Sequence, residues 1–188
     1  MRILVVGAGG VGDAVARIAA RRNFFDKMVV ADYDLAKAQA TVDAVADLAA
    51  GRFEAAFVDA SSADSVADLI RAHGITHVLN AVDPRFVMGI FNGAFAAGAD
   101  YLDMAMSLSH PHPDKPYSVT GVKLGDEQFA QAQAWEDAGR LALVGIGVEP
   151  GLSDVFARYA ADHLFSEIDE LGVRDGANLA VHDEDGNE

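Results

Sequence analysis

The sequence predicts an α/β fold built on a doubly wound parallel sheet, and three observations support this prediction. Apolar segments of strand length alternate with segments of helix length along most of the chain, as in βαβ units whose parallel sheet is covered on both faces. The first strand runs into a turn with the spacing G-x-G-x-x-G, and the second strand ends at Asp32, twenty residues beyond that turn. The turn consists of Gly7, Ala8, Gly9, Gly10, Val11 and Gly12. Together these features predict a Rossmann-type dinucleotide-binding domain.

The first half of the chain contains three strand–helix units. We expect strands at 3–6, 27–31 and 53–58, followed by helices at 13–22, 35–50 and 63–72. The strands are short apolar runs, and the first helix places Val15, Ile18 and Ala19 on one face. Asp34 is the expected N-cap of the second helix, and Gly74 ends the third.

The second half continues the alternation with one interruption. We expect strands at 75–81, 100–104 and 141–146, helices at 85–97 and 126–138, and a last helix that contains Val155 and Leu164. The segment 107–121 interrupts this pattern and holds three of the five prolines together with His110 and His112. Because these histidines lack a rigid scaffold and a third ligand, we predict no metal site there. We expect instead a loop that faces a substrate or a partner.

The predicted ligand site lies at the carboxyl ends of the strands, where open α/β sheets bind ligands. The glycine turn allows a pyrophosphate to approach the N-terminus of the first helix, which favours negative charge. Asp32 is expected to accept hydrogen bonds from the adenosine ribose, whereas Asp59 either contacts the adenine or caps its own turn. Beyond the glycine turn, the predicted cofactor-binding residues are Asp32, Tyr33, Asp59, Ala60, Asn80, Ala81, Val82 and Pro84.

Composition narrows the classes of partner. The formal net charge is −15, which argues against nucleic acid and anionic membranes because both would be repelled. The sequence contains no cysteine, so disulfides and thiolate sites are excluded. Met1 leads directly into a core strand and no apolar run is long enough to span a bilayer. These features predict a cytoplasmic protein.

The pattern changes near the end of the chain. From Glu167 onward the sequence is typical of an antiparallel hairpin, with its turn at 175–178. Because an isolated hairpin is marginally stable, we expect it to pair with another copy or to begin a further part of a longer protein. We therefore predict a dinucleotide-binding domain over 1–165 and the start of a second α+β domain over 166–188.

Four segments carry a family resemblance, and the last, a strand entering a Pro-Gly turn and a long helix, is more specific than the glycine turn. They are ILVVGAGGVG at 3–12, ITHVLNAVDPRF at 75–86, ADYLDMA at 99–105 and LVGIGVEPGLSDVFARYAADHLF at 143–165. They resemble the amino-terminal part of the saccharopine dehydrogenase-like family of nicotinamide-dependent oxidoreductases. The resemblance implies a catalytic and dimerisation domain after the Rossmann domain, a homodimer, and a role in lysine metabolism. It also implies hydride transfer at a carbon–nitrogen bond of an amino dicarboxylate.

Residues at the predicted site refine this hypothesis. We favour NAD as cofactor because the carboxylate of Asp32 would repel the 2′-phosphate of NADP. NADP stays the alternative cofactor. Asp103, at the end of the fifth strand, is the candidate proton relay, weighed against a role as a turn hydrogen-bonder. The rival functions are a non-catalytic dinucleotide-sensing regulatory domain and a dimerisation scaffold. Without the substrate half, we expect the chain to bind NAD(H) but to turn over poorly.

Overall fold

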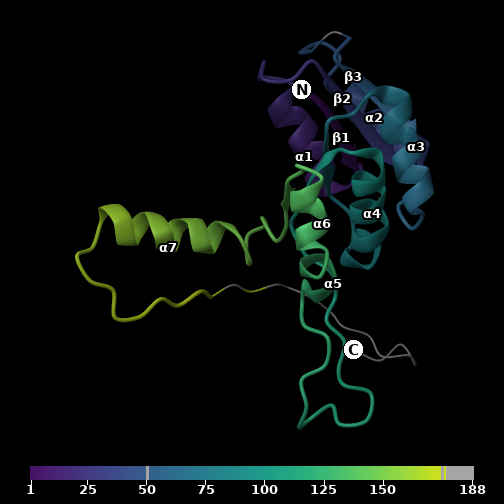
Figure 1. The fold of residues 1–188 in the computed structure, drawn as a ribbon. Helices are drawn as coiled ribbons and strands as arrows, with labels where there is room; N and C mark the ends of the chain where they lie inside the picture. Colours follow the sequence, from purple (N-terminus) through teal and green to yellow (C-terminus); the bar gives the residue numbers. More distant parts are fainter. Residues whose placement is uncertain (50, 175, 177–188) are drawn as a thin grey trace, which may run out of the picture.

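A six-stranded parallel sheet forms the centre of the computed structural model, which describes residues 1–49, 51–174 and 176 (Figure 1). The strands are β1 (Arg2–Val6), β2 (Lys27–Asp32), β3 (Phe53–Phe57), β4 (His77–Asn80), β5 (Asp100–Asp103) and β6 (Ala142–Leu143). Their order is β3-β2-β1-β4-β5-β6, and all neighbouring strands are parallel. The order reverses between β1 and β4, the switch point at which doubly wound folds bind dinucleotides. The predicted fold class is confirmed.

Helices cover both faces of the sheet. The helices of the body are α1 (Gly10–Ala19), α2 (Leu35–Asp43), α3 (Ala63–His73), α4 (Val87–Ala97), α5 (Asp126–Phe129) and α6 (Ala132–Asp137), with a 3-10 turn, η1, at Pro84–Phe86. A further helix, α7 (Leu152–His163), lies outside the body. Side chains of β1 alternate between the two faces, as in any strand. Ile3 and Val5 pack with α1 and α2, whereas Leu4 and Val6 pack in the cluster that includes α3, α4 and Trp135 of α6. Trp135 is therefore a core residue.

Helices α3 and α4 approach closely at Gly93. A Cβ atom at Gly93 would lie 2.7 Å from both the carbonyl oxygen of Ala63 and Cβ of Val66. We expect Gly93→Ala to lower the free energy of unfolding by about 1–3 kcal/mol through overpacking, measured by chemical denaturation. The control is Ala96→Gly, exposed on the same helix, which should cost about 1 kcal/mol through helix propensity alone. A Gly93→Ala protein at least as stable as the wild type would refute this account of the packing.

Several predicted elements are shorter than expected or divided. The strand predicted over 75–81 spans only His77–Asn80. The helix predicted over 35–50 ends at Asp43, and turns with i→i−3 bonds, such as Val45 N–H to the Val42 carbonyl, follow it. The helix predicted over 126–138 is divided into α5 and α6. The sixth strand ends at Leu143 because Gly145, with φ of 70°, leaves the extended conformation.

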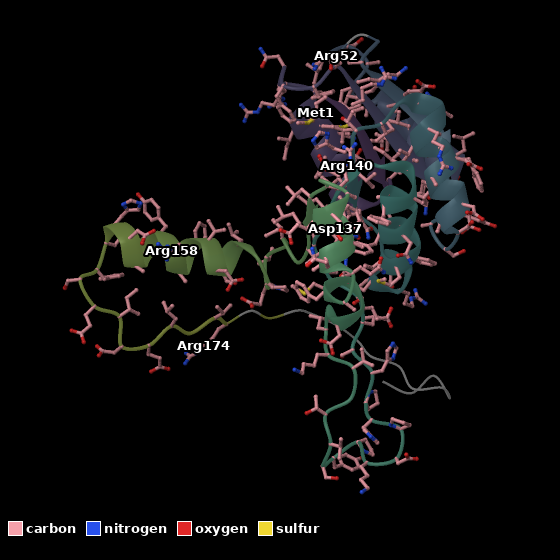
Figure 2. The ribbon with its side chains drawn as sticks, viewed as in Figure 1. Met1, Arg52, Asp137, Arg140, Arg158 and Arg174 are labelled. Carbon is pink, nitrogen blue, oxygen red and sulfur yellow. The ribbon has the colours of Figure 1, made fainter. Side chains whose placement is uncertain are left out.

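The segment that contains α7 extends away from the body of the sheet (Figure 1). Arg158 on α7 and Arg174 beyond it both lie on this extended segment (Figure 2). Residues 167–174 contain no strand, so the first half of the predicted hairpin does not form in them. Its second half lies outside the described residues. Within the described part of the chain, no helix is long and apolar enough to cross a membrane.

Candidate functional site

A cleft of about 490 Å³ lies beside the carboxyl ends of β1, β2 and β3. Six of the predicted cofactor-binding residues line it, namely Gly7, Asp32, Tyr33, Asp59, Ala60 and Val82. Ser61 and Phe86 also line the cleft and were missed in the sequence, where neither follows a strand directly. The volume is within the range of small-molecule and cofactor sites.

The glycine turn is crowded on one side and open on the other. Gly7 has φ of 105°, and a Cβ atom there would lie 2.7 Å from the Ala81 carbonyl oxygen. A Cβ atom at Gly12 would lie 1.8 Å from the carbonyl oxygen of Gly7, so the start of α1 rests directly on the turn. Around Gly9 and Gly10, a Cβ atom would meet nothing within 4 Å. This open side can admit a ligand close to the backbone.

The N-terminus of α1 begins at this open side. Gly9 is the N-cap and, because it has no side chain, it cannot cap the first N–H groups. The hydrogen bond from Asp13 N–H to the Gly9 carbonyl closes the first turn. The first N–H groups of a helix have no partner within the helix. Those of α1 are therefore available to phosphate oxygens, which the positive end of the helix dipole also attracts.

Asp32 joins the glycine turn to the end of β2. Its Oδ2 accepts a hydrogen bond of 2.8 Å from Ala8 N–H, and its Oδ1 accepts one of 2.9 Å from Asp34 N–H. Each carboxylate oxygen can accept a second hydrogen bond, so the side chain retains capacity for ribose hydroxyl groups. The structure thus brings together the two features on which the dinucleotide prediction depends.

Tyr33 and Asp59 border the cleft from neighbouring strands. Tyr33 is exposed, and its ring centroid lies 5.5 Å from that of Phe57. Asp59 Oδ1 accepts hydrogen bonds from the hydroxyl (2.6 Å) and the backbone N–H (2.9 Å) of Ser61, and these two bonds lower the pKa of the Asp59 carboxyl. The structure therefore shows Asp59 capping its own turn while it also lines the cleft.

Asn80 is placed beneath the cleft and not in its lining. Its side chain is 2% exposed; Oδ1 accepts from Val82 N–H (3.2 Å) and Nδ2 donates to the Tyr101 hydroxyl (3.0 Å). The Ala81 carbonyl packs against the glycine turn, and Pro84 opens η1. Asn80 is therefore connected to the cleft lining through Val82.

Asp103 is buried, with 1% of its surface exposed. It accepts four hydrogen bonds, from the Tyr101 hydroxyl, Gln128 Nε2, Met106 N–H and Gly145 N–H. A carboxylate has about four lone-pair sites, so none is left for a substrate proton. The geometry favours the turn hydrogen-bonder over the predicted proton relay. Gln128, a buried polar residue of α5, was not identified from the sequence because helical spacing alone does not predict its partner.

In the proline-rich loop, local hydrogen bonds hold the ring of one of the two histidines. His112 Nδ1 accepts from the backbone N–H groups of Asp114 and Lys115, each at 3.2 Å. His110 pairs with Val122 through an antiparallel bridge of backbone atoms. Among the residues that the structure describes, no group of three His, Cys, Asp or Glu side chains is arranged to hold a metal ion.

One family model matches the part of the chain that contains this site. The model described as the saccharopine dehydrogenase NADP binding domain matches residues 3–143, which include the glycine turn, Asp32 and all of the sheet except Arg2. The chain belongs to the saccharopine dehydrogenase family. The resemblance seen in the sequence is thereby confirmed, and so is the prediction of a nicotinamide dinucleotide as the cofactor class.

The relatives of this saccharopine dehydrogenase family domain are longer than this chain. Carboxynorspermidine synthase of Vibrio alginolyticus is 32% identical over 183 residues, covering 93% of this chain and 43% of the relative. Carboxyaminopropylagmatine dehydrogenase of Synechocystis is 30% identical over 177 residues, covering 93% and 41%. The chain therefore spans less than half the length of these relatives.

Solved structures agree on the fold. Saccharopine dehydrogenase (L-Glu forming) of Saccharomyces cerevisiae superimposes with a TM-score of 0.63 at 18% identity, over 87% of this chain and 31% of that one. GenD2 from gentamicin A biosynthesis, solved in complex with NAD, gives a TM-score of 0.54 at 17% identity, over 77% and 34%. At these identities the likeness concerns the architecture.

Proposed function

We propose that this chain is the cofactor-binding domain of a nicotinamide-dependent oxidoreductase that transfers hydride at a carbon–nitrogen bond. One observation carries the proposal: the uncapped N-terminus of α1 and the carboxylate of Asp32 meet at the glycine turn. These are the two groups that hold a pyrophosphate and a ribose. A dinucleotide-sensing module is less well supported, because the relatives with the same domain are named as enzymes.

Within this proposal the favoured cofactor is NAD(H). Although the matching family model is described as an NADP binding domain, the 2′-phosphate of NADP would lie against the carboxylate of Asp32. Two unit charges about 4 Å apart repel by roughly 1 to 4 kcal/mol near a protein surface. That energy corresponds to a factor of about five to several hundred in affinity.

The proposed substrate class is a secondary amine that carries a carboxyl group. The resemblance seen in the sequence implies an amino dicarboxylate, whereas two relatives are named for carboxylated polyamines. Both classes contain a secondary amine whose carbon–nitrogen bond belongs to a chain that carries a carboxyl group. The net charge of −15 favours the polyamine end of this class, because a polycation is attracted to an acidic protein. Because this chain by itself is expected to turn over poorly, rates of NAD⁺ reduction by a longer protein that carries this domain together with a substrate-binding part, measured with carboxynorspermidine and with saccharopine, distinguish the two. A homodimeric, cytoplasmic enzyme is part of the same proposal.

Calorimetric titration with NADH and with NADPH tests the cofactor proposal. We expect a dissociation constant for NADH of about 1 to 10 μM and a value for NADPH at least about tenfold higher, because Asp32 accepts from the ribose and repels the phosphate. Equal affinities would contradict the preference for NAD(H). An absence of heat with both ligands would contradict the assignment of the cleft as a cofactor site.

A further inference from the structure

A buried hydrogen-bond network lies beneath the carboxyl ends of β4, β5 and β6, with Asp103 at its centre. Oδ2 of Asp103 accepts from the Tyr101 hydroxyl (2.9 Å) and from Gln128 Nε2 (2.7 Å). Oδ1 accepts from the backbone N–H groups of Gly145 (2.7 Å) and Met106 (3.2 Å). One side chain therefore connects β5 with α5 and with the turns that follow β5 and β6.

The network extends to the cofactor cleft through Asn80. Since Asn80 Oδ1 accepts from Val82 N–H, its Nδ2 must face the Tyr101 hydroxyl and donate to it. The hydroxyl accepts this bond and donates its single hydrogen to Asp103. Burial, and next the negative charge of Asp103, raise the pKa of the Tyr101 hydroxyl, so the phenol keeps that hydrogen. The direction of every bond from Val82 to Asp103 is thus determined.

The same carboxylate holds the turns after β5 and β6. Gln128 Oε1 accepts from Ser107 N–H (2.8 Å), which leaves its Nε2 to donate to Asp103. Met106 has φ of 60° and Gly145 has φ of 70°. A left-handed conformation is costly for a residue with a Cβ atom unless surrounding contacts hold it. The bond from Met106 N–H to Asp103 is such a contact.

We propose that Asp103 is a positioning residue for the nicotinamide half of the cofactor site, an inference that rests on the function proposed above. A doubly wound sheet binds one mononucleotide on each side of its switch point. The cleft with Asp32 is lined mainly from the β1–β3 side and reaches the switch point at Val82 and Phe86, which follow β4. The nicotinamide half is therefore assigned to the β4–β6 side beyond Val82. On that side Asp103 holds Met106 and Gly145 directly, and it holds Val82, at the border between the two halves, through Tyr101 and Asn80. It acts on the cofactor through these groups without touching it.

The substitution Asp103→Asn tests this role in the purified protein. Each oxygen of Asp103 accepts two hydrogen bonds, so whichever oxygen the new NH₂ group replaces, two of the four hydrogen bonds are lost and donors face each other in their place. We expect the dissociation constant for NADH to rise about tenfold, whereas that for ADP-ribose, which lacks nicotinamide, should change less than about twofold. The fluorescence of bound NADH, which reports on the nicotinamide, should shift toward that of the free cofactor.

Two further variants accompany this measurement. Tyr101→Phe keeps the ring that packs against Phe91 and removes only the hydroxyl; it should show the same selective loss of NADH affinity, about threefold. Asp100→Asn is the matched control, because Asp100 lies at the opposite end of β5 and its Oδ1 likewise accepts a backbone N–H, that of Leu141. It should bind both ligands as the wild type does.

The outcomes separate the two proposals. If the wild type binds NADH and ADP-ribose, and Asp103→Asn binds both equally well or loses both to the same extent, the positioning role is overturned. If Asp103→Asn does not fold, Tyr101→Phe decides the question by the same comparison. Failure of the wild type to bind either ligand overturns the proposed function instead.

Discussion

Gly12→Val should strongly weaken dinucleotide binding and destabilise the first βαβ unit. A Cβ atom at this position would lie 1.8 Å from the carbonyl oxygen and 2.9 Å from the carbonyl carbon of Gly7. Both are backbone atoms of the turn, so no side chain can rotate away, and α1 must separate from β1. We expect the free energy of unfolding to fall by about 3 kcal/mol or more and the NADH dissociation constant to rise at least about 100-fold.

Chemical denaturation and titration with NADH measure the two effects, and Gly10→Ala is the control for stability. A Cβ atom at Gly10 meets nothing within 4 Å, and the residue is the first of α1. Its free energy of unfolding should stay the same or rise by up to about 1 kcal/mol through helix propensity. A Gly12→Val protein as stable as Gly10→Ala would show that the turn and α1 are not in the contact described.

Asp32→Ser should change the cofactor preference from NADH toward NADPH. The substitution removes the charge that repels a 2′-phosphate and the oxygens available to the ribose. We expect NADH to bind about tenfold more weakly and the ratio of the NADPH to the NADH dissociation constant to fall by about 100-fold. Because the hydrogen bonds from Ala8 and Asp34 N–H are also lost, stability should fall by about 1–2 kcal/mol.

Titration of both cofactors against each variant tests this expectation, with Asp34→Ser as the control. Asp34 is the N-cap of α2 and accepts from Ala36 N–H, a role that serine performs equally well. The control therefore removes a carboxylate two residues away while α2 stays capped. If the two variants changed the cofactor ratio equally, net charge and not Asp32 would be responsible.

Local sequence patterns were sufficient for the fold and for one end of the site. The order of strands and helices follows from apolar runs and their periods, because a strand buried on both faces must be apolar throughout. The glycine turn and Asp32 were also recognisable, since a close backbone approach at Gly7 and Gly12 tolerates no side chain. For these positions the sequence by itself determined both the structure and its interpretation.

Tertiary structure alone decided the roles of the polar residues at the other end of the sheet. Asn80 and Asp103 each follow an apolar run, which suggests exposure to a ligand, yet both are buried. Their partners come from elsewhere: Gln128 lies 25 residues and Gly145 42 residues beyond Asp103. A carboxylate becomes a relay or an anchor according to the donors that surround it. Those donors are brought together by the packing of α5 and the turn after β6, which no local pattern encodes.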